Sequence, residues 1–132
     1  MIYGNILTPD GWLLGELPWQ DGRLQRIDGK PLDPETNDAP RILPGFIDLP
    51  VHGGGGADTM EGGEAAATMA RTHARFGTTS LLATTMTAPD AEIRRVLGEI
   101  GELMRGKPAG GARVLGVHLE GPYINSGKLG AQ

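Results

Sequence analysis

The chain has 132 residues, the usual size of one domain and enough for a hydrophobic core. Its net charge of -4 argues against nucleic acid or an anionic membrane as the main partner, because both select basic surfaces. It contains no cysteine, which excludes disulfide bonds, thiolate catalysis and cysteine-bound zinc and leads us to expect a reducing, cytoplasmic setting. No apolar run reaches the roughly 20 residues that span a bilayer, and we expect no secretory signal.

The first 41 residues predict a small β-domain. Strands are expected at 2–8, 12–17 and 23–27, with turn sequences between them. Residues 30–40 are rich in Pro, Asp, Glu and Asn and predict a loop. No polar cluster in this region has catalytic spacing, so we expect domain 1–41 to support the fold only.

From residue 42 the pattern changes to alternating strands and helices. Strands are expected at 42–51, 79–86 and 113–120, and apolar side chains recur at helical spacing over 64–76 and 93–103. The first of these strands is largely apolar, which is typical of burial on both faces. Thr87 is the expected N-cap of the second helix. The order β-α-β-α-β predicts parallel strands in an α/β fold over 42–132.

Two architectures begin with this order of elements, an open doubly wound sheet and a TIM-like (β/α)8 barrel. A barrel needs eight strands and about 250 residues. If the chain comes from a barrel, it therefore holds only the first three β/α units, and the barrel is incomplete in this chain.

Two polar side chains stand at the ends of predicted strands. His52 ends the first parallel strand and Glu120 ends the third, and the C-terminal ends of parallel strands meet at one edge of the sheet. Because alternate residues share a face, Asp48 and Pro50 are expected beside His52. His118 is expected on the face of Glu120 for the same reason. An imidazole and a carboxylate suit a divalent metal such as zinc, although a polar pair that merely ends two strands is the alternative.

Other polar residues favour plainer roles. His73 lies on the apolar stripe of a helix and is expected to pack or to be half exposed rather than to bind a metal. Residues 53–56 are four glycines without a following Lys-Ser/Thr, so a loop that lets backbone pass close to a substrate is favoured over a phosphate-binding loop. Asp48 is either a buried orienting carboxylate or a strand cap, and His118 either packs in the core or supports Glu120.

The motifs together resemble one family. Leu43-Pro44-Gly45-Phe46-Ile47-Asp48, ahead of a histidine and a glycine-rich loop, is similar to the first barrel strand of the amidohydrolase superfamily. The more specific stretch is His118-Leu119-Glu120-Gly121-Pro122 with the later Lys128-Leu129-Gly130-Ala131, which resembles the N-acetylglucosamine-6-phosphate deacetylase branch. The resemblance covers the whole chain and implies a small β-sandwich-type domain before the barrel.

The resemblance also implies a chemistry, the metal-dependent hydrolysis of the acetamide of N-acetylglucosamine 6-phosphate to glucosamine 6-phosphate and acetate. Glu120 matches the family's metal-binding glutamate, and His52 matches the second histidine of a His-x-His pair. Pro50 replaces the first histidine and cannot ligate, so a single divalent ion, zinc, is favoured over two. Ala131 and Gln132 match the pair that contacts the sugar.

The family's general-base aspartate and two further metal-binding histidines come from later strands, so no catalytic residue is expected in this chain. His118 and Asp48 are then expected to contact the metal ligands and orient them, without binding the metal themselves. The expected partners are a small amino-sugar phosphate, the remaining barrel strands and a second copy in a homodimer. The isolated chain is expected to be inactive.

Two alternatives stay open at this point. The first is another amidohydrolase that acts on a different N-acyl sugar or on a cyclic amide. The second is a non-catalytic truncated or proteolytic fragment that associates through its open sheet edge, since unpaired strand edges favour pairing with other chains.

Overall fold

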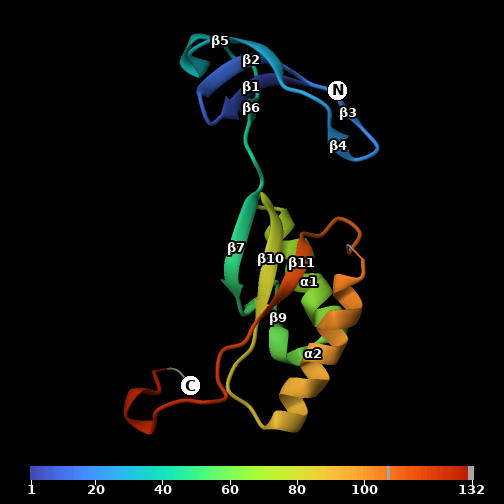
Figure 1. Cartoon of the computed structure of the whole chain (residues 1–132), viewed down its shortest axis with the longest axis vertical. Helices are drawn as coiled ribbons and strands as arrows, with labels where there is room; N and C mark the ends of the chain where they lie inside the picture. Colours follow the sequence, from blue (N-terminus) through green and yellow to red (C-terminus); the bar gives the residue numbers. More distant parts are fainter. Residues whose placement is uncertain (107, 131–132) are drawn as a thin grey trace. The chain divides into compact units, whose positions relative to one another are not determined.

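The computed structural model describes residues 1–106 and 108–130, which form a mixed α/β fold (Figure 1). The chain divides into two compact units, 1–44 and 45–132, a little beyond the boundary expected after residue 41. Among the described residues, no helix is long and apolar enough to cross a membrane.

The N-terminal unit is built on a four-stranded sheet with the order β5-β2-β1-β6. Its strands are β1 (Ile2–Thr8), β2 (Gly11–Leu17), β5 (Asp28–Pro31) and β6 (Arg41–Ile42). β1 pairs antiparallel with β2 and parallel with β6, and β2 pairs antiparallel with β5. A separate short hairpin joins β3 (Trp19–Gln20) to β4 (Arg23–Leu24), and a 3-10 turn, η1, spans Pro34–Thr36.

The strand expected at 23–27 and the loop expected at 30–40 are both wrong in part. The sheet continues through β5, which takes in the first two residues of that predicted loop, Lys30 and Pro31. The physical reason is a glycine pair: Gly15 of β2 lies opposite Gly29 of β5. A Cβ atom on Gly15 would lie 1.8 Å from the carbonyl oxygen of Asp28, so the two backbones approach more closely than side chains allow.

The C-terminal unit contains a three-stranded parallel sheet with the order β11-β10-β7. The strands are β7 (Phe46–Val51), β10 (Thr78–Thr84) and β11 (Arg113–His118). Helix α1 (Gly63–Ala74) joins the first two strands and helix α2 (Asp90–Met104) joins the second and third. The smaller elements are a hairpin of β8 (Gly53–Gly54) and β9 (Ala57–Asp58) and the 3-10 turns η2 (Thr59–Glu61) and η3 (Ser126–Lys128). The predicted parallel β-α-β-α-β order is confirmed.

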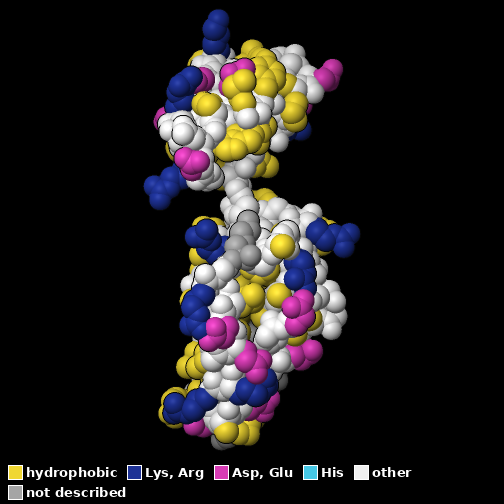
Figure 2. Space-filling view, turned by 90° about the vertical axis from the view of Figure 1, so that its right-hand side faces the viewer, with side chains coloured by type: hydrophobic (Ala, Val, Ile, Leu, Met, Phe, Trp, Pro, Cys, Tyr) yellow, Lys and Arg dark blue, Asp and Glu magenta, His cyan; other side chains and the backbone are white. Residues whose placement is uncertain are grey.

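Both helices pack on the same face of this sheet (Figure 1). The buried cluster between them consists of Val51, Ala66, Met69, Ala70, Leu81, Ala83, Val96, Ile100, Ala112 and Val114. Acidic and basic side chains mix over the outer side of the helix layer (Figure 2). One such ion pair, Arg94 with Asp90 at 2.7 Å, lies one turn apart on α2, and its hydrogen bond raises the pKa of the Arg94 guanidinium.

Several boundaries differ from the predictions. The apolar run 42–51 is split between β6 and β7, and β7 is an edge strand whose side chains Phe46, Ile47 and Leu49 are more than half exposed. The predicted burial on both faces is therefore wrong, because the helices cover only one face of this sheet. Phe76 is also exposed, since α1 ends at Ala74 before reaching it.

The expected glycine loop and helix cap also differ. Residues 53–58 form the β8–β9 hairpin, whose turn places Gly55 and Gly56 at φ 67° and 79°, a region that favours glycine. Thr87 is not the N-cap of α2. Pro89 occupies that position without a side-chain cap, because the helix begins directly at Asp90.

Candidate metal centre at the strand ends

A β-bulge in β7 decides which side chains reach the candidate site. Asp48 pairs with Leu81 of β10, and Val51 pairs with Ala83. Two residues of β7 therefore lie between these pairs against one residue of β10, which is the pattern of a bulge. Both Asp48 and Val51 face the helix layer as a result, and His52, the next residue, points to the opposite face.

His52 and Glu120 meet on that opposite face. The Nε2 atom of His52 lies 3.0 Å from the Oε2 atom of Glu120, and the two side chains are 39% and 36% exposed. His52 directly follows β7 and Glu120 lies just past the end of β11. The convergence of these two side chains, predicted from their places at the strand ends, is observed in the structure.

Two buried threonines fix the backbone beside His52. The amide of Thr59 donates to the carbonyl of His52 at 2.7 Å, and the hydroxyl of Thr59 donates to the carbonyl of Val51 at 3.2 Å. The hydroxyl of Thr84 on β10 accepts a hydrogen bond from the amide of Val51 at 3.0 Å. Val51 lies on β7, directly after the bulge that interrupts the regular ladder between the two strands. Thr59 and Thr84 are both fully buried, so water does not compete for the hydrogen bonds that hold this strand end.

A third buried threonine holds the backbone of Glu120. The hydroxyl of Thr85 accepts a hydrogen bond from the amide of Glu120 at 3.1 Å and donates to the carbonyl of the same residue at 3.2 Å. Thr85 itself is tied to β11, because its amide donates to the carbonyl of His118 at 3.1 Å. The segment that carries the carboxylate is thus bound to the end of β10.

Asp48 faces the helix layer instead of the His52–Glu120 pair. Its Oδ2 atom lies 3.5 Å from Nδ1 of His73 on α1, while Nε2 of His73 lies 3.0 Å from the carbonyl oxygen of Gly53. The predicted common face of Asp48, Pro50 and His52 is therefore wrong, because the bulge reverses the alternation. His73 is partly buried, as expected, and it joins α1 to β7 and to the β8–β9 hairpin.

The remaining predicted site residues have different positions. The side chain of His118 is exposed, so the expected packing in the core is wrong. Ala131 and Gln132 lie outside the described residues.

The donor pair fits part of a metal site. A histidine nitrogen and a carboxylate oxygen are ligands that zinc accepts at about 2.0–2.2 Å, and a separation of about 3 Å between the two atoms is compatible with one shared ion. Within 1–106 and 108–130, no group of three or more His, Cys, Asp or Glu side chains is arranged to hold a metal ion. The Nδ1 atom of His52 is buried without a hydrogen-bond partner in that part of the chain. The pair thus offers two candidate ligands, fewer than the three protein ligands of a catalytic zinc site.

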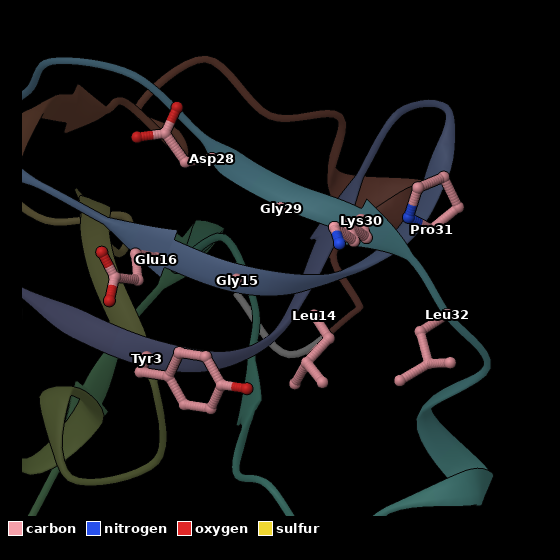
Figure 3. Close-up of a pocket in the computed structure, with 9 residues that line it drawn as sticks. All are labelled: Tyr3, Leu14, Gly15, Glu16, Asp28, Gly29, Lys30, Pro31 and Leu32. Carbon is pink, nitrogen blue, oxygen red and sulfur yellow. The ribbon is translucent and has the colours of Figure 1, made fainter.

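A cavity of about 650 Å³ lies elsewhere, on the sheet of the N-terminal unit. Figure 3 shows the side chains that line it from neighbouring strands, among them Tyr3, Leu14, Glu16 and Lys30. None of its lining residues is a histidine, and its charged lining residues are two carboxylates, Glu16 and Asp28, and one lysine, Lys30. Its chemistry does not match metal-assisted hydrolysis, so the strand-end pair is the better candidate.

Known proteins similar to the chain are sugar-phosphate deacetylases. No family model matches the chain. It is 40% identical over 130 residues to N-acetylgalactosamine-6-phosphate deacetylase of Escherichia coli O157:H7, which covers 96% of the chain and 34% of that protein. It is 38% identical over 133 residues to N-acetylglucosamine-6-phosphate deacetylase of Rattus norvegicus, covering 97% of the chain and 32% of that protein.

The fold has similar neighbours among solved structures. The crystal structure of N-acetylglucosamine-6-phosphate deacetylase from Thermotoga maritima matches with a TM-score of 0.80 and 30% identity, over 99% of the chain and 34% of that structure. The enzyme of the same name from Pasteurella multocida matches with a TM-score of 0.75 and 29% identity, over 96% of the chain and 35% of that structure. The predicted resemblance to this family is confirmed, and the chain spans about a third of the length of these relatives.

Proposed function

We propose that the chain is part of a metal-dependent deacetylase that hydrolyses the acetamide of N-acetylglucosamine 6-phosphate to glucosamine 6-phosphate and acetate. The observation that carries the proposal is the 3.0 Å approach of His52 and Glu120 at the strand ends. The relatives support it, because they match nearly the whole chain at 38–40% identity and are named as deacetylases of N-acetylated hexosamine 6-phosphates.

In this proposal, His52 Nε2 and Glu120 Oε2 hold one divalent ion, for which zinc is the best fit to a nitrogen and an oxygen ligand. The ion, when bound, polarises the acetamide carbonyl and lowers the pKa of a water molecule. Pro50 stands where a second histidine would come from the same strand, and proline has no side-chain donor, so one ion is favoured. A third protein ligand must come from outside the described residues.

The chain's own residues orient the reacting groups. Thr59 and Thr84 fix the strand end before His52, and Thr85 fixes the backbone of Glu120. The carboxylate of Asp48 is directed to His73, so we do not assign it the role of general base. We expect that base, an aspartate, outside this chain. Gln132 and Ala131 remain our candidates for contact with the sugar.

A second substrate has support from one observation. The relative from Escherichia coli O157:H7, at 40% identity, acts on N-acetylgalactosamine 6-phosphate, the epimer at C4. The acetamide and the phosphate are the same in both sugars, so the residues described above serve either substrate. Other N-acyl sugars and cyclic amides remain less supported substrates. The partners we propose are the sugar phosphate, the further strands that close a barrel, and a second copy in a homodimer.

The test is acetate release from both N-acetylhexosamine 6-phosphates. It is applied to the 132-residue chain and to a chimera in which the chain replaces its matching segment in the Thermotoga maritima deacetylase. We expect turnover by the zinc-loaded chimera and none by the chain alone, because residues 1–106 and 108–130 offer only two candidate metal ligands. A folded chimera that binds zinc but releases no acetate from either sugar would contradict the proposed function. Turnover by the chain alone would contradict the proposed division of the active site.

A further inference from the structure

Glu120 lies where the regular backbone ladder no longer holds it. β11 ends at His118, and a backbone hydrogen bond from Thr85 to that histidine joins the two segments at 3.1 Å. Two residues further on, Glu120 has left the strand and precedes Gly121, which turns the chain at φ 73°. A carboxylate placed on such a corner needs another means of keeping its position.

The hydroxyl of Thr85 supplies that means. It accepts from the amide of Glu120 at 3.1 Å and donates to the carbonyl of Glu120 at 3.2 Å, so one side-chain group binds both backbone polar groups of one residue. A threonine hydroxyl has one donor and two acceptor sites, and this arrangement uses the donor and one of the acceptors. The contact replaces the pair of ladder bonds that a longer strand would give to this position.

Burial makes the contact rigid. Thr85 has no exposed surface, and its β-branched side chain has few accessible rotamers. Water therefore does not compete for the hydroxyl, and hydrogen bonds in such surroundings are stronger than in solvent. With its backbone fixed, Glu120 directs its carboxylate through side-chain torsions alone.

The His52 side of the pair is held by different residues. Thr59 binds the carbonyl of His52 and Thr84 binds the amide of Val51, while the hydroxyl of Thr85 binds only Glu120 within residues 1–106 and 108–130. A change at Thr85 is therefore expected to displace one member of the pair and to leave the other in place.

We propose that Thr85 is the positioning residue for Glu120, its buried hydroxyl setting the carboxylate against His52 for metal binding. The proposal rests on the proposed function, in which Glu120 is a metal ligand. Residues that hydrogen-bond to a metal ligand and fix its orientation typically lower metal affinity by about 10- to 100-fold when they are replaced. Thr85 contacts the backbone of the proposed ligand Glu120, so loss of its hydroxyl is expected to weaken metal binding by about 10-fold or more.

The test compares three variants of the 132-residue chain. Thr85→Val keeps the shape and removes the hydroxyl, and Thr85→Ser keeps the hydroxyl. Thr78→Val makes the same replacement in a threonine that is also buried, at the opposite end of β10, and serves as the matched control. Far-UV circular dichroism first establishes that each variant is folded.

Two measurements follow. The first is the exchange rate of the Glu120 amide proton by NMR, which reports the hydrogen bond without any metal. The second is the zinc affinity by calorimetry, with His52→Ala giving the background from zinc bound elsewhere. We expect Thr85→Val to speed amide exchange by about 10-fold or more and to weaken zinc binding by about 10-fold or more. Thr85→Ser and Thr78→Val are expected to stay within about 3-fold of the parent in both measurements, a margin inside the scatter of single contacts.

Each outcome decides the proposal. A folded Thr85→Val chain with parental amide exchange at Glu120 overturns it, and so does a Thr85→Ser chain that behaves like Thr85→Val. If the parent binds zinc no better than His52→Ala, the proposed function loses its support, and the amide measurement alone decides the positioning. If Thr85→Val does not fold, Thr85→Ala takes its place. In the parent chain, the Glu120 amide proton is expected to exchange more slowly than an unprotected amide, and exchange at the unprotected rate overturns the proposal.

Discussion

Nε2 of His52 and Oε2 of Glu120 lie 3.0 Å apart although their strands are not neighbours in the sheet. His52 follows β7 and Glu120 follows β11, and β10 lies between these two strands. The two side chains therefore meet across the end of β10, where its last residue, Thr84, and the next residue, Thr85, bind the backbone on either side. The central strand of the sheet thus sets the distance between the two proposed ligands.

Glu120→Gln is expected to lower zinc affinity strongly. The amide keeps the size of the side chain but removes its negative charge. A structural zinc site with four ligands gains roughly 10–16 kcal/mol, which is about 2.5–4 kcal/mol for each ligand. Loss of one ligand therefore predicts a fall of at least about 100-fold, measured by calorimetry on the chain. In the chimera with the Thermotoga maritima deacetylase, acetate release is expected to fall with zinc content.

The matched control is Glu99→Gln on α2. Glu99 makes an exposed ion pair with Arg95 at 3.0 Å, and such pairs contribute only about 0.3–0.5 kcal/mol. Zinc affinity is expected to be unchanged in this control. Full zinc affinity in Glu120→Gln would remove Glu120 from the ligands.

Gly121→Ala is expected to disturb the corner that follows Glu120. The new Cβ atom would lie 2.3 Å from the hydroxyl oxygen of Thr87, and the residue has φ 73°, which costs a non-glycine residue about 1–2 kcal/mol. The clash adds to that cost, so we expect a loss of more than about 2 kcal/mol in the free energy of unfolding, measured in urea.

Gly110→Ala separates the two causes. Gly110 has φ 68°, but a Cβ atom there would meet nothing within 4 Å, so only the backbone cost applies. Equal losses in the two variants would show that the contact with Thr87 is unimportant.

Much of the C-terminal unit could be predicted from the sequence, because its patterns are local. Helical spacing located both helices, and the position of His52 and Glu120 at strand ends predicted that they meet. The face of Asp48 could not be predicted. A strict period of two assumes an unbroken ladder, and the bulge between Asp48 and Val51 depends on pairing with a strand distant in the sequence.

The buried threonines were missed for a related reason. Thr59, Thr84 and Thr85 have no pattern that distinguishes them from other strand and loop threonines, and their roles depend on hydrogen bonds to other segments of the chain. One signal was present in the sequence. Two adjacent threonines follow a run of apolar residues at the end of β10, on the edge where parallel strands carry functional groups.

His73→Ala is expected to loosen the β8–β9 hairpin. The ring joins Asp48 at 3.5 Å to the carbonyl of Gly53 at 3.0 Å, and its loss leaves that partly buried carbonyl without this partner. An unsatisfied buried group costs about 1–3 kcal/mol, so we expect a loss of that size in stability and faster hydrogen exchange in the hairpin. His73→Gln is expected to recover part of the loss, because its amide can donate to the same carbonyl. Parental exchange rates in His73→Ala would contradict an anchoring role.

Asn5→Ala is expected to destabilise the N-terminal unit. Asn5 has no exposed surface, and its side chain exchanges two hydrogen bonds with the side chain of Asn37, at 2.9 and 3.0 Å. It also donates to the carbonyl of Ala39 at 2.8 Å, so one side chain on β1 binds the segment that leads into β6. Its removal leaves these groups without their partner, at a cost of about 2–4 kcal/mol. Loss of chemical-shift dispersion for residues of β1, β2 and β5 measures the effect.

Asn125→Ala is the matched control for this variant. Asn125 is exposed and accepts one local hydrogen bond from the amide of Gly127 at 2.8 Å. Its replacement is expected to change stability by less than about 1 kcal/mol, because caps of this kind are worth that amount in exposed positions. Asn5→Asp provides a further check, since a buried carboxylate keeps the shape but cannot donate to Asn37 or Ala39. Native dispersion in Asn5→Asp would mean that the donated bonds of Asn5 do not hold this unit together.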